Sequence, residues 1–205
     1  MAKELIIFLF LFLAVFGLLL FVFNGRFIYA QIKYSFIGPP ELKDFSEKDF
    51  VLPPKNEEHK ERYIPSRLVI PVIGVDAPVV LPQSTNEADL QIALEKGVIF
   101  WPGSALLGEN GAMIILGHSS AYPWYRGNYG SVFSLLDKLQ IGDEIFIYVQ
   151  DKQFGYRVLE KQIELPQNLS LEANQEGSVL YLLSCWPIRT DWKRIAIKAI
   201  SIDKI

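Results

Sequence analysis

The sequence predicts an all-β domain, a closed or nearly closed barrel of about eight short strands with one or two short helices, behind an N-terminal transmembrane helix. Short runs of β-branched, aromatic and aliphatic residues recur at fairly regular spacing, with turn formers between them. Helical patterning is confined to short stretches, which argues against a helical bundle or an alternating βαβ sheet. The third observation is a long uncharged run near the N-terminus.

This N-terminal run, residues 5–23, contains no charged side chain. A helix rises about 1.5 Å per residue, so the run approaches the roughly 30 Å of a bilayer's hydrocarbon core. A cleaved signal peptide is the alternative, with a candidate cleavage site at 28–30. Signal-peptide cores are shorter, about 7 to 15 residues. The sequence therefore favours an uncleaved anchor over residues 1–24.

Residues 25–64 mix charged residues with prolines and show little apolar periodicity, which predicts a stalk. His59 lies in the charged run 55–62 and is expected to be solvated. The remaining residues, 65–205, are sized for one domain. The net charge of the 205-residue chain is −3, without the clustered Lys and Arg that a nucleic-acid surface needs. Nucleic-acid binding is therefore excluded.

Within the domain, residues 86–97 predict the main helix, with Asn86 as N-cap and Gly97 just past the last turn. Turn formers separate the strand runs, for example at 108–111 and 142–143. The predicted strands are 67–71, 77–81, 98–101, 113–116, 144–149, 156–163, 179–184 and 195–200.

Cys185 is the only cysteine and follows the apolar run 179–184. A lone thiol cannot close an intramolecular disulfide, so it either packs in the core or acts as a nucleophile. A free cysteine titrates near about 8.5, so little thiolate exists at neutral pH unless a neighbouring cation or dipole assists. Its surroundings favour the nucleophile.

His118 follows a second apolar run, 113–116, where the chain must turn outward. Histidine titrates near about 6.5 and is the side chain most often used for proton transfer. Taken alone, a strand-end histidine that binds a backbone carbonyl is an equal alternative. The lone thiol of Cys185 favours the acid–base role.

Arg194 starts the last predicted strand and is the candidate cation. Its guanidinium stays charged and donates in a planar fork, which suits a substrate carbonyl or an oxyanion. The strand period of two puts Arg194 on the face of Ala196 and Lys198, opposite the apolar face. An ordinary surface arginine is the simplest alternative, and Arg189 in the preceding loop is a competitor. A strand holds a guanidinium more rigidly than a loop does, which favours Arg194.

Together these motifs resemble the sortase family over about residues 65–205. That family combines a Gly-His strand end, a Thr-Leu-x-Thr-Cys strand and a downstream arginine, and this chain has Leu116-Gly117-His118, Leu182-Leu183-Ser184-Cys185 and Arg194 in the same order. Similar segments also occur at 68–79 and 102–104. Tyr181 and Ser184 stand where the family usually has threonine, so the subclass, class D or E in our prediction, and the peptide preference stay open.

The resemblance implies a transpeptidase anchored in the bacterial cytoplasmic membrane, with the stalk and catalytic domain on the extracytoplasmic side. Cys185 would attack a backbone carbonyl of an LPxTG-like sorting motif and form a thioacyl enzyme. His118 would protonate the leaving amine and later deprotonate the incoming one, and Arg194 would orient substrate and stabilise the oxyanion. The implied partners are substrate proteins with a sorting motif and an amine acceptor, a cell-wall peptide or a pilin lysine. This chemistry needs no metal or organic cofactor.

The sorting peptide is expected in a groove beside Cys185. The candidate substrate-binding residues are Ser184, Trp186, Ser119 and Trp124. No zinc or calcium motif is present, and no metal site is predicted. An anchored cysteine hydrolase with water as acceptor and a non-catalytic peptide-binding barrel remain the alternatives.

Overall fold

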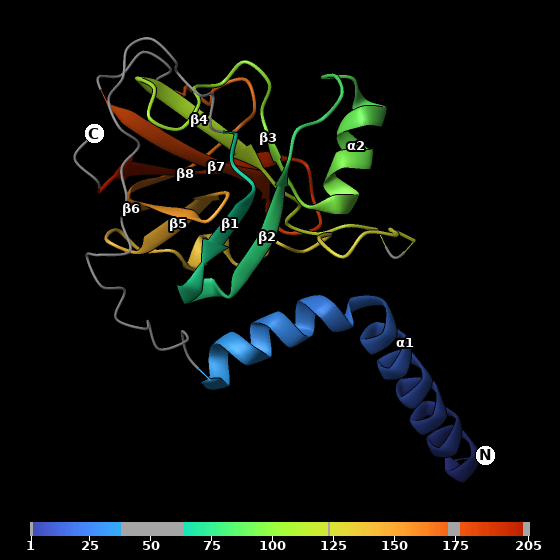
Figure 1. Cartoon of the computed structure of the whole chain (residues 1–205). Coiled ribbons are helices and arrows are strands. Elements are labelled where there is room, and N and C mark those ends of the chain that lie inside the picture. Colours follow the sequence, from blue (N-terminus) through green and yellow to red (C-terminus); the bar gives the residue numbers. More distant parts are fainter. Residues whose placement is uncertain (1, 38–63, 123, 172–176, 203–205) are drawn as a thin grey trace.

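The computed structural model describes residues 2–37, 64–122, 124–171 and 177–202 (Figure 1). Most of the predicted stalk, with His59, lies outside the described residues, so the domain boundary predicted there is not tested.

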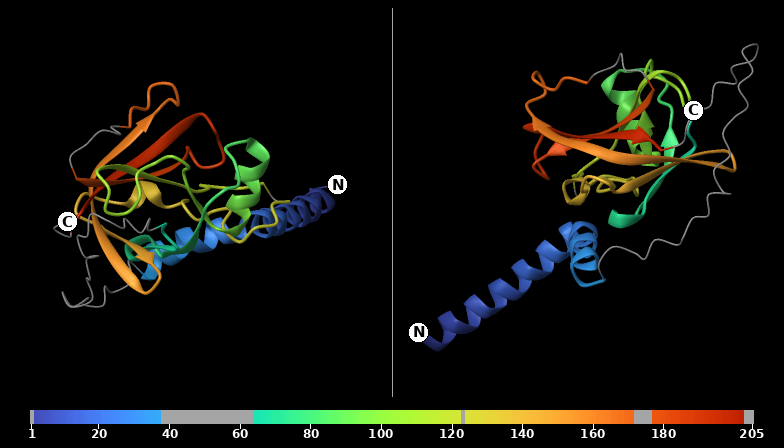
Figure 2. Two further views of the ribbon diagram at one scale, coloured as in Figure 1. Left: turned by 45° about the horizontal axis from the view of Figure 1, so that its top comes forward. Right: turned by 90° about the vertical axis from the view of Figure 1, so that its left-hand side faces the viewer.

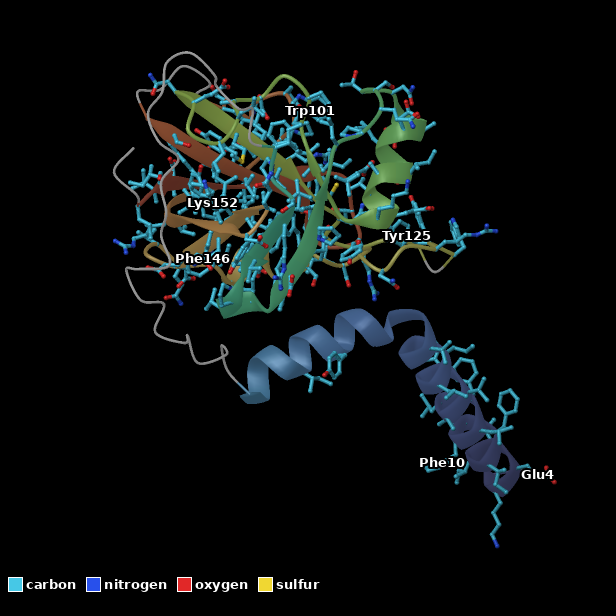
Figure 3. All side chains as sticks on the ribbon, in the orientation of Figure 1. Glu4, Phe10, Trp101, Tyr125, Phe146 and Lys152 are labelled. Atoms are coloured by element: carbon cyan, nitrogen blue, oxygen red, sulfur yellow. The ribbon has the colours of Figure 1, made fainter. Side chains whose placement is uncertain are left out.

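Helix α1 spans Ala2–Ile37 and is longer than the predicted anchor. Residues 25–37, predicted as the start of the stalk, are helical because the first proline of the chain is Pro39 and nothing before it breaks the helix. The helix bends part-way along its length (Figures 1 and 2). Apolar side chains such as Phe10 project from it and are exposed (Figure 3). None of the helices in the described part of the chain is both long enough and apolar enough to cross a membrane.

Eight strands form the predicted barrel, in the order β1-β2-β3-β4-β7-β8-β6-β5, and β1 pairs with β5 to close it (Figures 1 and 2). The pairs β2–β3 and β4–β7 are parallel, and the other pairs are antiparallel. The strands are β1 Arg67–Ile70, β2 Val75–Val80, β3 Val98–Phe100, β4 Gly111–Leu116, β5 Glu144–Val149, β6 Lys152–Glu164, β7 Ser178–Trp186 and β8 Lys193–Ser201.

Several strands begin earlier than predicted because the turns are tighter than their sequences indicate. A short 3-10 helix, η2 (Pro71–Ile73), and Gly74 at φ 66° complete the turn after β1, so β2 starts at Val75. Gln150 at φ 54° closes the β5–β6 turn, so β6 starts at Lys152. A second 3-10 helix, η3, spans Leu136–Lys138.

Helix α2 (Glu87–Lys96) connects the parallel strands β2 and β3 and packs against both. Its N-cap is Asn86, as predicted: the Asn86 side chain accepts a hydrogen bond of 2.8 Å from the Asp89 amide. Gly97 ends the helix in an extended rather than a left-handed conformation. Glycine is required there because a β-carbon would collide with the Pro78 carbonyl oxygen.

The barrel has a large interior core and a small second cluster on the outer face of β4 and β7. Alternate residues of β4, β7 and β8 point into the interior, namely Met113, Ile115, Leu180, Leu182, Ile195, Ile197 and Ala199. The second cluster is built from Ala112, Val179 and Tyr181, with Ile114 and Leu171 against it. The β4–β7–β8 sheet therefore has a distinct outer face, and residues that continue its alternation lie there.

Candidate active site

The three predicted reacting residues belong to three neighbouring strands of this sheet. Because β4 and β7 run parallel, their carboxyl ends meet at one edge, and the antiparallel β8 starts at that edge. His118 lies just past the end of β4, Cys185 lies at the end of β7, and Arg194 lies at the start of β8. The loops after β4 and β7 both lie at the α2 end of the barrel (Figures 1 and 2).

Cys185 and Arg194 are direct partners in the antiparallel pairing of β7 with β8. Side chains in such positions share a face, with β-carbons about 4.5–5.5 Å apart. The interior residues at 195 and 197 put Arg194 on the outer face, as the alternation predicts. Cys185 is partly exposed, and the Arg194 guanidinium donates to the carbonyls of Asp191 (2.8 Å) and Lys193 (3.1 Å). The cation is thus held at the strand start by the backbone of its own loop.

His118 is brought to the same edge by an extension of the β4–β7 pairing. The Gly117 amide donates to the Leu183 carbonyl (3.1 Å), and the Ser184 hydroxyl donates to the Gly117 carbonyl (2.7 Å). Gly117 is needed because a β-carbon there would lie 2.5 Å from the buried ring of Phe133. The register therefore continues from the Leu116–Leu183 pair toward His118 beside Cys185.

The imidazole of His118 is largely buried, and its Nε2 has no hydrogen-bond partner among the described residues. Burial lowers the pKa of His118 from its ordinary value, and the charge of Glu87 opposes this effect. The main chain of the same residue is fixed by the Phe133 amide, which donates to the His118 carbonyl (2.9 Å). At neutral pH the ring is therefore predominantly neutral and able to accept a proton.

The four predicted substrate-binding residues occupy different environments. Ser184 and Ser119 are buried, with exposed fractions of 4% and 2%, and the Ser184 hydroxyl is already used to join β7 to Gly117. Trp186 is partly buried and packs on the interior core. Trp124 is 75% exposed and stacks on Tyr122, with ring centroids 4.8 Å apart. Their contact with a substrate stays a prediction.

The structure adds two contacts at this edge that the motifs did not indicate. The Ser120 hydroxyl accepts a hydrogen bond of 2.8 Å from the Arg189 amide, which joins the loop after His118 to the loop after Cys185. The ring of Tyr125 contacts the imidazole of His118. Neither has a signal in the sequence, because both depend on how the loops return to the site. Over the described ranges, no cluster of three or more His, Cys, Asp or Glu side chains is arranged for a metal ion.

A thiol, an imidazole and a guanidinium at one strand edge are typical of a cysteine-dependent acyl transferase. The family model for the sortase domain matches residues 68–201. The chain belongs to the sortase family, whose members are cysteine transpeptidases. The resemblance inferred from the Gly-His, Ser-Cys and Arg motifs is confirmed at the level of the family.

Solved structures similar to this one are also sortases. Sortase A from Corynebacterium diphtheriae has 26% sequence identity and a TM-score of 0.58, over 71% of this chain and 63% of that chain. A sortase D5 transpeptidase from Clostridium perfringens has 26% identity and a TM-score of 0.54, over 67% and 78%. Sortase C from Clostridium perfringens with the C-terminal cell wall sorting motif has 22% identity and a TM-score of 0.55, over 70% and 73%. A search of curated proteins finds no match. Because classes A, C and D all match, class D or E stays a prediction.

We expect His118 to make the stability of the protein depend on pH. The unfolded chain, with a histidine pKa of about 6.5, binds the proton more readily than the native state, so the free energy of unfolding rises with pH between the lowered native pKa and about 6.5. This stability is fully present above about pH 6.5 and is lost as the pH falls through the native pKa. Urea unfolding of the full chain in detergent micelles at a series of pH values measures it.

In a His118→Gln variant the unfolding midpoint should vary less with pH over this window than in the natural chain. His59→Gln, at the chain's other histidine, is the matched control and should leave the pH dependence in place. An equal pH dependence in all three proteins would contradict the expectation.

Proposed function

We propose that this sortase cleaves an LPxTG-like sorting motif through a thioacyl intermediate on Cys185 and transfers the acyl group to an amine. The observation that supports the proposal is the strand register: the parallel β4–β7 pair and the Cys185–Arg194 pair bring His118, Cys185 and Arg194 to one edge of the sheet. The structural similarity to a sortase C with the C-terminal cell wall sorting motif supports the substrate class. The natural partners we propose are proteins that carry such a motif and a cell-wall or pilin amine.

In the first step the thiol proton of Cys185 passes to His118, and the sulfur attacks the scissile carbonyl carbon. The carbon–nitrogen bond breaks as the thioester forms, and His118 returns the proton to the leaving amine. In the second step an incoming amine attacks the thioester and gives a proton to His118. A new amide forms, the sulfur–carbon bond breaks, and the thiol recovers its proton.

Arg194 has a different role in this scheme, because negative charge develops on the carbonyl oxygen in both steps. A guanidinium fixed beside the sulfur stabilises that charge without having to reorganise. The Asp191 and Lys193 carbonyls hold the guanidinium at the strand start before substrate arrives. This preorganisation is the reason to assign the role to Arg194.

Incubation of the full chain in detergent micelles with an LPxTG-like peptide should produce a thioester on Cys185, the only thiol of the chain. Intact-mass spectrometry detects the adduct, and addition of triglycine should convert the product from the hydrolysed peptide to the peptide–triglycine amide. Cys185→Ala should form no adduct and lose on the order of 10³-fold or more in turnover. Hydrolysis alone, with triglycine present, would indicate the hydrolase. No adduct from any sorting peptide would contradict the proposal.

Replacement of Arg194 should lower the rate far more than replacement of Arg189. Arg194→Ala removes the oxyanion donor and should decrease kcat by about 10²-fold. Arg189→Ala should change kcat by no more than about twofold, because the Arg189 hydrogen bond to Ser120 uses the main-chain amide, which the variant keeps. Steady-state kinetics of amide formation by the two variants compares them. A larger loss in Arg189→Ala would reverse the assignment.

We propose further that the uncharged N-terminal run 5–23 anchors the enzyme at the cytoplasmic membrane, with the barrel on the extracytoplasmic side. The support is the uncharged run 5–23 and the exposure of apolar side chains within it, among them Leu5, Phe16 and Val22. The full chain should stay in the membrane pellet after alkaline carbonate extraction, and intact mass should show no cleavage after Ala30. Deletion of residues 1–24 should release the chain. Recovery of the full chain in the soluble fraction would contradict the anchor.

A further inference from the structure

Tyr125 lies on the loop after β4, below α2 in the view of Figure 3, and contacts His118 directly. The two rings meet edge to face, with centroids 5.3 Å apart and planes at 88°. This geometry is the one that aromatic rings favour, and the contact covers part of the imidazole. The tyrosine ring is therefore part of the environment that buries the proton-transfer group.

The hydroxyl of Tyr125 ties the same ring to α2. It donates a hydrogen bond of 2.6 Å to the carbonyl of Leu94, in the last turn of the helix. The last four carbonyls of a helix have no partner within it, so this hydroxyl satisfies one of them. One side chain thus joins the imidazole at the strand edge to the carboxyl end of a helix.

We propose that Tyr125 is a positioning residue that holds the His118 imidazole for proton transfer with Cys185 and couples its position to α2. The proposal rests on the function assigned above to His118. Tyr125 itself touches neither substrate nor the reacting sulfur in this scheme; it acts through the imidazole.

The packing of the loop leaves the tyrosine ring little freedom. A β-carbon on Gly130 would lie 2.9 Å from the Tyr125 ring, and one on Gly127 would lie 2.7 Å from the ring and 2.6 Å from the Glu95 backbone. The Tyr125 amide also donates to the Tyr122 carbonyl (2.9 Å). Two glycines therefore allow the loop to close around the ring and to approach α2.

The charges around the two rings are consistent with this role. Burial, with a smaller effect of Glu95, raises the pKa of Tyr125 to about 12, so its hydroxyl keeps the proton that it donates to Leu94. The ring of Tyr125 packs on His118, and the charge of Glu87 from α2 acts on it. The strand register brings Cys185 and Arg194 to the same edge of the sheet. Removal of the Tyr125 ring admits water to the imidazole, which should raise its pKa toward the ordinary value.

The test compares Tyr125→Ala with Tyr125→Phe in the full chain in detergent micelles. Titration of the histidine ring protons by NMR gives the pKa of His118, which is identified by its absence in His118→Gln. Tyr125→Ala should raise that pKa and lower kcat/KM for amide formation on the order of 10-fold. Tyr125→Phe keeps the ring and should retain the natural pKa, with a loss of about threefold or less from the missing hydrogen bond. Tyr148→Phe, which removes a hydroxyl bound to Gln153 elsewhere in the barrel, should change neither value.

An unchanged His118 pKa or an unchanged kcat/KM in Tyr125→Ala would overturn the proposal. The proposal would also fail if Tyr125→Phe kept the natural His118 pKa but lost as much kcat/KM as Tyr125→Ala. If Tyr125→Ala does not fold, Tyr125→Leu replaces it, since it keeps apolar volume but not the edge-to-face contact. The NMR titration does not depend on turnover. A natural chain that forms no thioester would therefore contradict the proposed function, while the effect of Tyr125 on His118 is still measured.

Discussion

The active-site edge depends on the parallel pairing of β4 with β7. Two parallel strands end at the same side of a sheet, so a histidine after one strand and a cysteine at the end of the other come to the same edge. Gly117 and Ser184, which are hydrogen-bonded at that edge, lie 67 positions apart in the chain. This bond, from the Ser184 hydroxyl to the Gly117 carbonyl, and the bond from the Gly117 amide to the Leu183 carbonyl fix the register. A slip of one residue would turn either side chain to the opposite face.

The same edge combines a largely buried imidazole with a partly exposed thiol. His118 is shielded by the barrel wall and by Tyr125, and this burial favours the neutral imidazole. Cys185 stays within reach of solvent, and Arg194 opposes it across the strand pair. In the proposed mechanism a protonated imidazole is therefore costly unless a negative charge lies close by, and the Cys185 thiolate would supply that charge.

Much of the fold followed from short-range pattern. Regular strand spacing predicted the barrel, and Asn86 predicted the start of α2, because strand alternation and helix capping are local effects. The strand starts were less accurate, since left-handed turns at Gly74 and Gln150 are decided by the register of whole strands. Gly97 ends the helix where expected, but the reason differs from the predicted one. Its backbone is extended rather than left-handed, and glycine is needed because a β-carbon would collide with the Pro78 carbonyl oxygen.

By itself the sequence determined the family, from the order of one thiol, one histidine after an apolar strand and one arginine at a strand start, and it predicted that these groups carry the chemistry. Only the tertiary structure decided how they are held. The buried hydroxyl of Ser184, predicted to meet substrate, joins two strands, and Tyr125 contacts His118 while bound to α2. These roles arise from contacts between segments that are distant in the chain. The type and spacing of side chains do not predict which distant segment a loop will pack against.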